Sequence, residues 1–149
     1  MSGETTGAVQ RILRLEGLFV LTAALAAYSK LGFGWGTFAL FFFTPDISFL
    51  GYLAGPRVGA VTYNTAHSYV GAISCLMAGF LMSEPLLSCA GVIWCAHIGF
   101  DRALGYGLKY PAGFGFTHLG LIGPFVKTAP NRDRENPHES PLQSPKNYQ

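Results

Sequence analysis

The sequence predicts an all-α integral membrane protein built as a four-helix up-down bundle, and three observations predict it. Hydrophobic residues make up 50% of the 149 positions, whereas charged residues make up 12%, about half the share usual in soluble domains. Most of the charges stand before Leu15 or after Asp101. Between these points lie four apolar stretches, each close to the roughly 20 residues that a helix needs to cross a bilayer.

The four expected spans belong to a transmembrane domain of residues 1–124 and occupy residues 12–28, 35–53, 58–82 and 85–104. Their short connections require neighbouring helices to run antiparallel. Pro85 opens the fourth span at the first helical position, where its missing N–H is tolerated. After this span we expect a Gly-rich, semi-polar C-terminal loop. Residues 125–149 are expected to form a disordered cytosolic tail, because they have almost nothing to bury.

The basic residues predict the orientation of the chain. With four spans, both termini and the second loop share one side of the membrane. Nine of the ten Lys and Arg residues fall on that side, and only Lys30 falls on the other, which is the bias of cytosolic segments. Both termini are therefore expected in the cytosol. A net charge of +2, with no basic stripe interleaved with aromatics, argues against a nucleic-acid partner.

Five ionisable residues interrupt the predicted spans: Glu16, Asp46, His67, His97 and Asp101. Such residues usually face a bundle interior or a hydrated cavity when they lie within a membrane. At a rise of about 1.5 Å per residue, all five lie within about 15 Å of the cytosolic ends of their helices. His97 and Asp101 are four residues apart, so they share a helix face. We expect one common polar pocket at this level, open to the cytosol or to lipid.

Further polar residues are expected to bind a substrate at this pocket. Asn64 stands three residues before His67 and therefore on the same helix face, and Pro45 is expected to open the backbone directly before Asp46. The predicted substrate-binding residues are Tyr63, Asn64, Tyr52, Arg57 and Tyr106. For the loop residues Tyr106, Lys109, Tyr110 and His118 two roles stay open, a lid over the pocket or anchors at the membrane interface.

Several blocks of the sequence resemble a known family. These are Arg14–Gly17, Pro45–Ser48, Gly51–Gly59, Tyr63–His67 and Ala96–Tyr110. Together they resemble the domain-of-unknown-function family numbered 4260, over about Arg11–Gly123. The resemblance implies four membrane spans and supplies no activity.

The leading functional hypothesis is an acid–base enzyme acting on a lipophilic small molecule from the membrane, without a cofactor or metal. Carboxylates and imidazoles in an apolar pocket suit such chemistry. Asp101 and Asp46 would form the acid–base pair, with Glu16 as a substitute and His67 and His97 as proton partners. The expected reaction is epoxide opening with cyclisation or hydrolysis, or an isomerisation. The layout is similar to that of small membrane-bound terpene cyclases of fungal pathways, by analogy alone.

Two other classes of function stay open. A metalloenzyme would use His67, His97 and a carboxylate from Asp101 or Asp46, although no HxxxH or HxxH pair is present. A non-enzymatic membrane subunit, lipid binder or proton-coupled carrier is the third reading, although the internal repeats typical of carriers are missing. Membrane lipid is an expected partner in every case, and a homo-oligomer is left open.

Overall fold

The computed structural model describes residues 7–111 and 115–121, and these are mostly helical. The elements are α1 (Gly7–Tyr28), α2 (Trp35–Phe42), the 3₁₀ helix η1 (Thr44–Ala54), α3 (Pro56–Ala66), α4 (Tyr69–Leu81) and α5 (Pro85–Leu104). Two short antiparallel strands, β1 (Phe116–Thr117) and β2 (Gly120–Leu121), follow α5. The all-α prediction is confirmed. The predicted tail, residues 125–149, lies outside the described residues.

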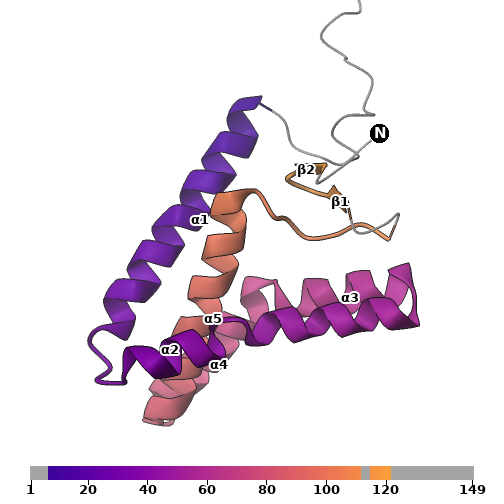
Figure 1. Ribbon diagram of the computed structural model, residues 1–149. Coiled ribbons are helices and arrows are strands. Elements are labelled where there is room, and N and C mark those ends of the chain that lie inside the picture. The colour runs from indigo at the N-terminus through magenta and orange to yellow at the C-terminus, as the bar shows by residue number, and fades with distance from the viewer. Residues whose placement is uncertain (1–6, 112–114, 122–149) are drawn as a thin grey trace, which may run out of the picture.

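Helix α5 is the centre of the fold. Helix α1 packs along one side of it and α4 along another, while η1 and α3 form a second pair that projects to one side of α5 (Figure 1). Helix α2 leads from the end of α1 into η1. The predicted up-down arrangement of a four-helix bundle is not confirmed, because the second and third expected spans are each divided into two helical elements.

The third expected span was predicted as a single helix over residues 58–82. Helix α3 ends at Ala66 and α4 begins at Tyr69. Between them, the Ser68 hydroxyl accepts a hydrogen bond of 3.1 Å from the Val70 N–H, the N-cap role for which serine is favoured. The single helix is therefore wrong, and His67 lies at a helix end rather than within a helix.

Pro45 changes the second expected span in another way. Proline has no N–H to donate to the carbonyl four residues back. At this point the chain tightens into η1, and the Asp46 N–H bonds the Phe43 carbonyl three residues back, at 3.1 Å. Helix α3 holds this segment, because the Thr62 hydroxyl donates to the Ser48 carbonyl at 3.0 Å. Asp46 is thus presented from a tight helix that leans on α3.

Helices α1 and α5 touch through two glycines. A Cβ placed on Gly17 would lie 2.8 Å from the Gly99 carbonyl oxygen, and one placed on Gly99 would lie 2.8 Å from the Gly17 carbonyl oxygen. Only a residue without a side chain allows the backbones to come so close, a packing device common between membrane helices. The contact fixes α1 against the half of α5 that carries His97 and Asp101.

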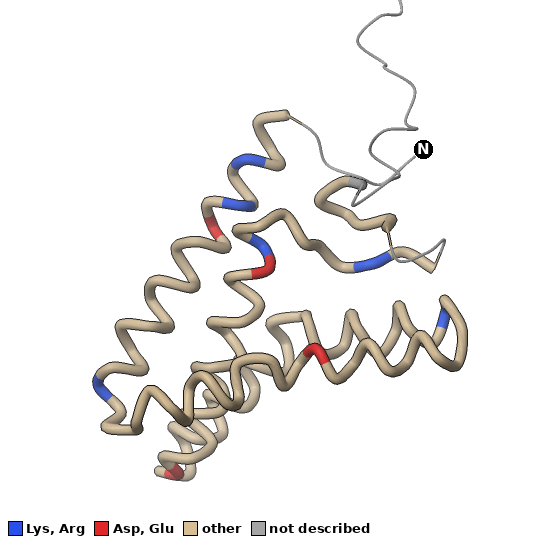
Figure 2. The backbone as a smooth tube through the Cα atoms, in the orientation of Figure 1, with Lys and Arg blue, Asp and Glu red and all other residues tan. Residues whose placement is uncertain are grey.

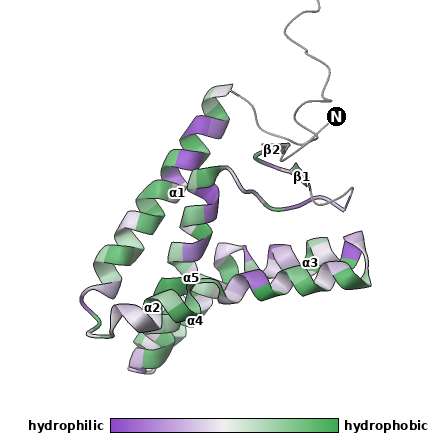
Figure 3. Cartoon of the chain, in the orientation of Figure 1, coloured by the Kyte–Doolittle hydropathy of each residue, from purple (hydrophilic) through white to green (hydrophobic). Residues whose placement is uncertain are grey.

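Hydrophobic residues occur along all the helices (Figure 3), and many of their large side chains are exposed. Large side chains such as Phe19, Leu53 and Phe80 are 74%, 87% and 76% exposed. The few charged positions gather mainly where α1 begins and α5 ends (Figure 2). Among the described residues, one segment, Trp35–Ala54, is long and apolar enough to cross a membrane.

Candidate functional site

Four titratable side chains from η1, α3 and α5 meet beside the break between α3 and α4. The His67 and His97 Nε2 atoms are 3.1 Å apart. Asp46 Oδ1 lies 3.4 Å from the first and 3.5 Å from the second, and Asp101 Oδ2 lies 3.5 Å and 3.9 Å from them. We call these residues the His–Asp cluster. Four of the five predicted catalytic residues therefore lie together.

His67 is held in one orientation by its own helix. Its Nδ1 lies 3.0 Å from the Tyr63 carbonyl oxygen, which can only accept, so Nδ1 carries the proton of the neutral ring. The Tyr63 ring stacks on the imidazole at 3.7 Å with an interplanar angle of 14°. Consequently Nε2 presents its lone pair to the cluster.

His97 is positioned by packing instead. The residue is 1% exposed, and the rings of Phe42 and Phe43 lie at steep angles to its ring, at centroid distances of 5.2 and 6.5 Å. Within the described part of the chain its Nδ1 has no hydrogen-bond partner. One turn later Asp101 accepts a hydrogen bond from the Tyr63 hydroxyl at 3.2 Å. The side chains of His97 and Asp101 share a face of α5, as their spacing predicts.

The two carboxylates differ in exposure. The Asp46 side chain is 31% exposed and the Asp101 side chain 15%, whereas both imidazoles are buried. In the described segments, the ion pairs of both carboxylates are with His67 and His97. Asp46 is therefore the open edge of the His–Asp cluster.

The family model described as Domain of unknown function (DUF4260) matches residues 10–122. The chain belongs to this family. No curated protein and no solved structure matches it. All four cluster residues of this DUF4260 protein lie within the matched range, so the cluster belongs to the family portion of the chain.

Of the predicted substrate-binding residues, Tyr63 contacts the cluster and Asn64 has another partner. The Asn64 amide nitrogen donates to the Lys109 carbonyl at 2.8 Å, and its amide oxygen accepts from the Lys109 N–H at 2.7 Å. The Asn64 amide thus pairs with both the N–H and the carbonyl of Lys109, in the way that the backbone of a neighbouring β-strand would. In this structure Asn64 fastens the loop after α5 onto α3.

The other three predicted substrate-binding residues are not brought to the cluster. The Tyr52 ring packs flat against Gly59, where even a Cβ would collide with it. Arg57 is exposed at the start of α3, about 15 Å along the helix from His67. Tyr106 is 42% exposed.

Glu16 also lies apart from the cluster. It is exposed on α1 and lines a second cavity of about 620 Å³ together with Arg102 and His118. In that region Arg102 donates through Nη2 to the His67 carbonyl at 3.3 Å, and its Nη1 lies 2.8 Å from His118 Nε2. This second polar region is built from a different face of α5.

The loop after α5 brings two more ionisable residues close to the site. Lys109 is 3% exposed, and its Nζ lies 4.8 Å from the centroid of the Tyr63 ring. Burial lowers the pKa of Lys109 to about 8, against the raising effect of Asp101. For His118, burial and then the charge of Arg102 lower the pKa. Two roles were left open for this loop, a lid over the pocket and an anchor at the membrane interface. The burial of Lys109 over the Tyr63 ring is compatible with a lid.

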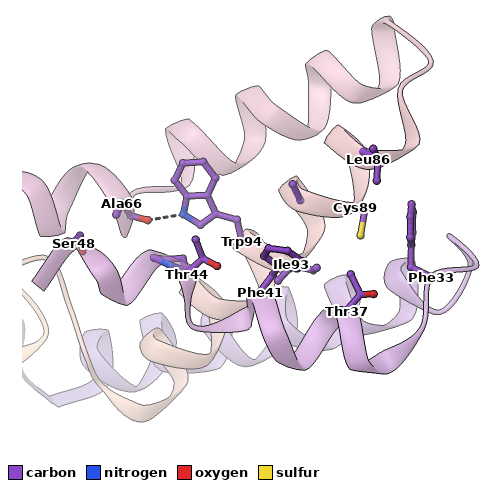
Figure 4. A pocket seen from close by; sticks show the side chains of 12 residues that line it. Phe33, Thr37, Phe41, Thr44, Ser48, Ala66, Leu86, Cys89, Ile93 and Trp94 are labelled. Atoms are coloured by element: carbon purple, nitrogen blue, oxygen red, sulfur yellow. Dashed lines mark hydrogen bonds between the residues drawn. The ribbon is translucent and has the colours of Figure 1, made fainter.

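A largely apolar cavity of about 600 Å³ (Figure 4) is lined in part by residues that directly precede cluster residues in the sequence. Thr44 and Pro45, directly before Asp46, line it, and so does Ala66, directly before His67. The Trp94 ring N–H donates to the Ala66 carbonyl and forms part of the wall (Figure 4). The remaining lining residues are Phe33, Thr37, Phe41, Ser48, Leu86, Cys89, Ala90 and Ile93. The sequence argument missed this cavity, although Trp94 precedes His97 by only three residues.

The arrangement allows two kinds of chemistry. Carboxylates and imidazoles at these separations can pass a proton between a substrate and water. The same nitrogen and oxygen atoms can also hold a metal cation. In both cases the reacting group would come from the adjoining apolar cavity.

Proposed function

We propose that this DUF4260 protein is a membrane enzyme that opens a carbon–oxygen bond of a lipophilic small molecule, an epoxide being the favoured substrate. One observation carries the proposal: a buried His–Asp cluster stands beside a cavity with apolar walls. Ligand sites of several hundred Å³ commonly combine an apolar lining with a few convergent polar groups. Acid–base groups in a cleft of this kind are candidates for catalysis.

The cavity accounts for the lipophilic part of the substrate. On α5 its lining extends from Leu86 to Trp94, about 12 Å along the helix axis. His97 follows within one further turn. An apolar chain lying along this face of α5 would bring its oxygen-bearing end to the cluster. Because Asp46 is the open edge, the reactive group enters beside it.

The proposed step is the addition of water to the epoxide. A bond forms between the water oxygen and a ring carbon while the ring carbon–oxygen bond breaks. Asp101, held by the Tyr63 hydroxyl, takes a proton from the water. Asp46, whose carboxyl oxygen lies beside the Nε2 atoms of both imidazoles, delivers a proton directly to the ring oxygen. The product is a diol, and the cluster regains its protons by transfer from Asp101 to Asp46. An internal hydroxyl in place of water gives cyclisation.

We place the enzyme in a membrane with four crossings and both termini in the cytosol. The exposed apolar faces support a lipid environment, and so does the glycine contact between α1 and α5. At the break between α3 and α4, the carbonyls of Ala66 and His67 accept from Trp94 and Arg102. Backbone that leaves a helix within a bilayer needs such internal partners. Reporter fusions after each expected span test this topology, and a reporter at the C-terminus that faces outward would refute it.

The activity is tested with the full chain in lipid nanodiscs and a panel of long-chain terminal epoxides. Mass spectrometry follows the addition of one water. Asp101→Asn is expected to lower turnover by about 10²–10⁴-fold, whereas Glu16→Gln, which alters a carboxylate outside the cluster, leaves it unchanged. Equal turnover in wild type and Asp101→Asn, or epoxides that bind without reacting, would favour the lipid-binder reading instead.

A further inference from the structure

We infer that the His–Asp cluster is a metal centre in which His67, His97 and Asp46 bind one divalent transition-metal ion and Asp101 stands beside it. The inference deepens the proposed function, since it concerns the same site. It stands on geometry that does not depend on which reaction is catalysed.

The separations of the three ligand atoms fit a shared ion. His67 Nε2, His97 Nε2 and Asp46 Oδ1 form a triangle with sides of 3.1, 3.4 and 3.5 Å. Metal–ligand bonds of about 2.0–2.2 Å place neighbouring ligands about 3.3–3.6 Å apart in a tetrahedron and about 2.8–3.1 Å apart in an octahedron. The triangle has the size of one face of such a site.

The protonation of His67 fits as well. Its Nδ1–H is committed to the Tyr63 carbonyl, so the Nε2 lone pair points at His97 Nε2 and at two carboxylate oxygens. A single proton on the neighbouring imidazole can satisfy only one of these contacts. Metal-bound histidines typically donate their second ring N–H to a carbonyl or carboxylate. The Tyr63 carbonyl is such a partner.

Charge balance gives a third argument. Asp46 and Asp101 bring two negative charges to a site walled by aromatic rings and buried imidazoles. Arg102, which follows Asp101 in sequence, instead donates to the His67 carbonyl and lies against His118. The buried cation Lys109 lies over the Tyr63 ring rather than among the four side chains. A divalent cation among them would compensate both carboxylates directly, and charged groups are rarely buried without compensation.

The donor set indicates the kind of ion. Two imidazoles and a carboxylate suit zinc or iron, and Zn²⁺ is the first candidate because it needs no redox partner. The cysteines Cys75, Cys89 and Cys95 are free and lie outside the cluster. Three protein ligands leave a position for water or a substrate oxygen, as in catalytic zinc sites. With the ion bound, Asp46 and the two imidazoles would be ligands, and the ion would replace proton delivery by Asp46 by polarising the epoxide oxygen as a Lewis acid. Asp101 would keep its role as the base.

The test measures metal binding directly. The full chain is purified in nanodiscs, stripped with a chelator and titrated with Zn²⁺, with the bound metal counted by elemental analysis. Co²⁺ replaces Zn²⁺ in a second titration, which follows visible absorption bands. We expect one ion per chain and Co²⁺ bands without the intense thiolate transitions of cysteine ligation. A wild-type protein that binds neither ion in a saturable manner would overturn the inference.

Variants assign the ligands. His67→Ala, His97→Ala and Asp46→Asn are each expected to weaken Co²⁺ binding by at least about 10–100-fold, while Glu16→Gln binds as the wild type does. Asp101→Asn is expected to keep the ion and lose turnover. His97→Gln, which preserves volume, and circular dichroism of every variant guard against misfolding. Loss of the ion from Asp101→Asn as complete as from His97→Ala would overturn the three-ligand assignment.

The same samples separate this inference from the proposed function. A protein that binds neither ion yet opens epoxides at the full rate would refute the metal centre and leave the enzyme intact. A protein that binds one ion per chain but converts none of the epoxides would keep the metal centre and refute the reaction.

Discussion

Two consecutive residues near the end of α5 enter two polar regions of opposite character. Asp101 enters the His–Asp cluster, where two carboxylate oxygens lie within 4 Å of two imidazole nitrogens that are themselves 3.1 Å apart. Arg102 enters the second cavity beside Glu16 and His118, where donors meet acceptors, as when the Leu108 N–H bonds His118 Nδ1 at 2.8 Å. The comparison teaches that a close group of carboxylates and imidazoles, which can take up a cation or a proton, distinguishes the proposed site, whereas polar and charged side chains occur in both regions.

The largest expected effect comes from removing one imidazole from each region. His97→Ala should lower epoxide turnover by about 10²–10⁴-fold, the range for a lost acid–base group, because it removes a lone pair that the cluster needs. His118→Ala, the matched change in the second region, should leave turnover within a few-fold of wild type. Steady-state kinetics in nanodiscs decide, and equal losses in both variants would erase the distinction between the regions.

The next effect concerns the fastening of the loop. Asn64→Ala leaves the Lys109 N–H and carbonyl without the side-chain amide that pairs with them, which should lower the free energy of unfolding by about 1–3 kcal/mol. Thr65→Ala is the control, since within residues 7–111 and 115–121 its hydroxyl bonds the Val61 carbonyl of its own helix and no other group. Chemical unfolding in detergent micelles measures both. Similar losses in the two variants would mean that the paired hydrogen bonds contribute nothing specific.

A smaller effect is expected within the cluster region. Tyr63→Phe removes the hydroxyl that donates to Asp101 but keeps the ring stacked on His67. Turnover should fall about 5–10-fold, the equivalent of one lost hydrogen bond, while metal content stays unchanged. Tyr69→Phe is the matched control, because its hydroxyl has no partner among the described residues. A Tyr63→Phe variant that loses its metal would show that the hydroxyl supports the ion rather than the base.

The smallest effect is a pH dependence from Lys109. Burial lowers its pKa from 10.5 to about 8, so between these values the unfolded chain binds more protons than the folded one. The free energy of unfolding should therefore rise with pH across this window. In Lys109→Met this contribution to the slope is lost. Melting temperatures measured from pH 7 to pH 10 test the difference. Identical slopes in the two proteins would mean that the pKa of Lys109 is the same in the folded and the unfolded chain.

The part of the site on α5 could be predicted from the sequence because a regular helix turns spacing into direction. His97 and Asp101, four residues apart, share a face, and their side chains enter the same cluster. For Glu16 the argument used depth alone, which fixes a level along the helix axis but no direction around it. Glu16 was therefore expected in the cluster, but it lines the second cavity.

For the part of the site at the end of α3, the sequence predicted which residues are polar but not where their side chains lie. The sequence placed His67 in a span with Asn64 on one face, but the helix ends there, so each residue has a different partner. The missed signal was Ser68, a favoured N-cap residue directly after a histidine. The place of Lys109 could not be predicted, because it depends on an amide pairing across 45 positions of the chain.

The orientation of His67 has a consequence for how this site can vary. Its ring N–H is anchored to a peptide oxygen, a group that every amino acid supplies. Replacing the side chain at position 63 alters the stacked aromatic and the hydroxyl, yet leaves the anchor in place as long as α3 keeps its last turn. Substitutions at position 63 would then change the site gradually. A change in where α3 ends would instead remove the carbonyl that orients His67.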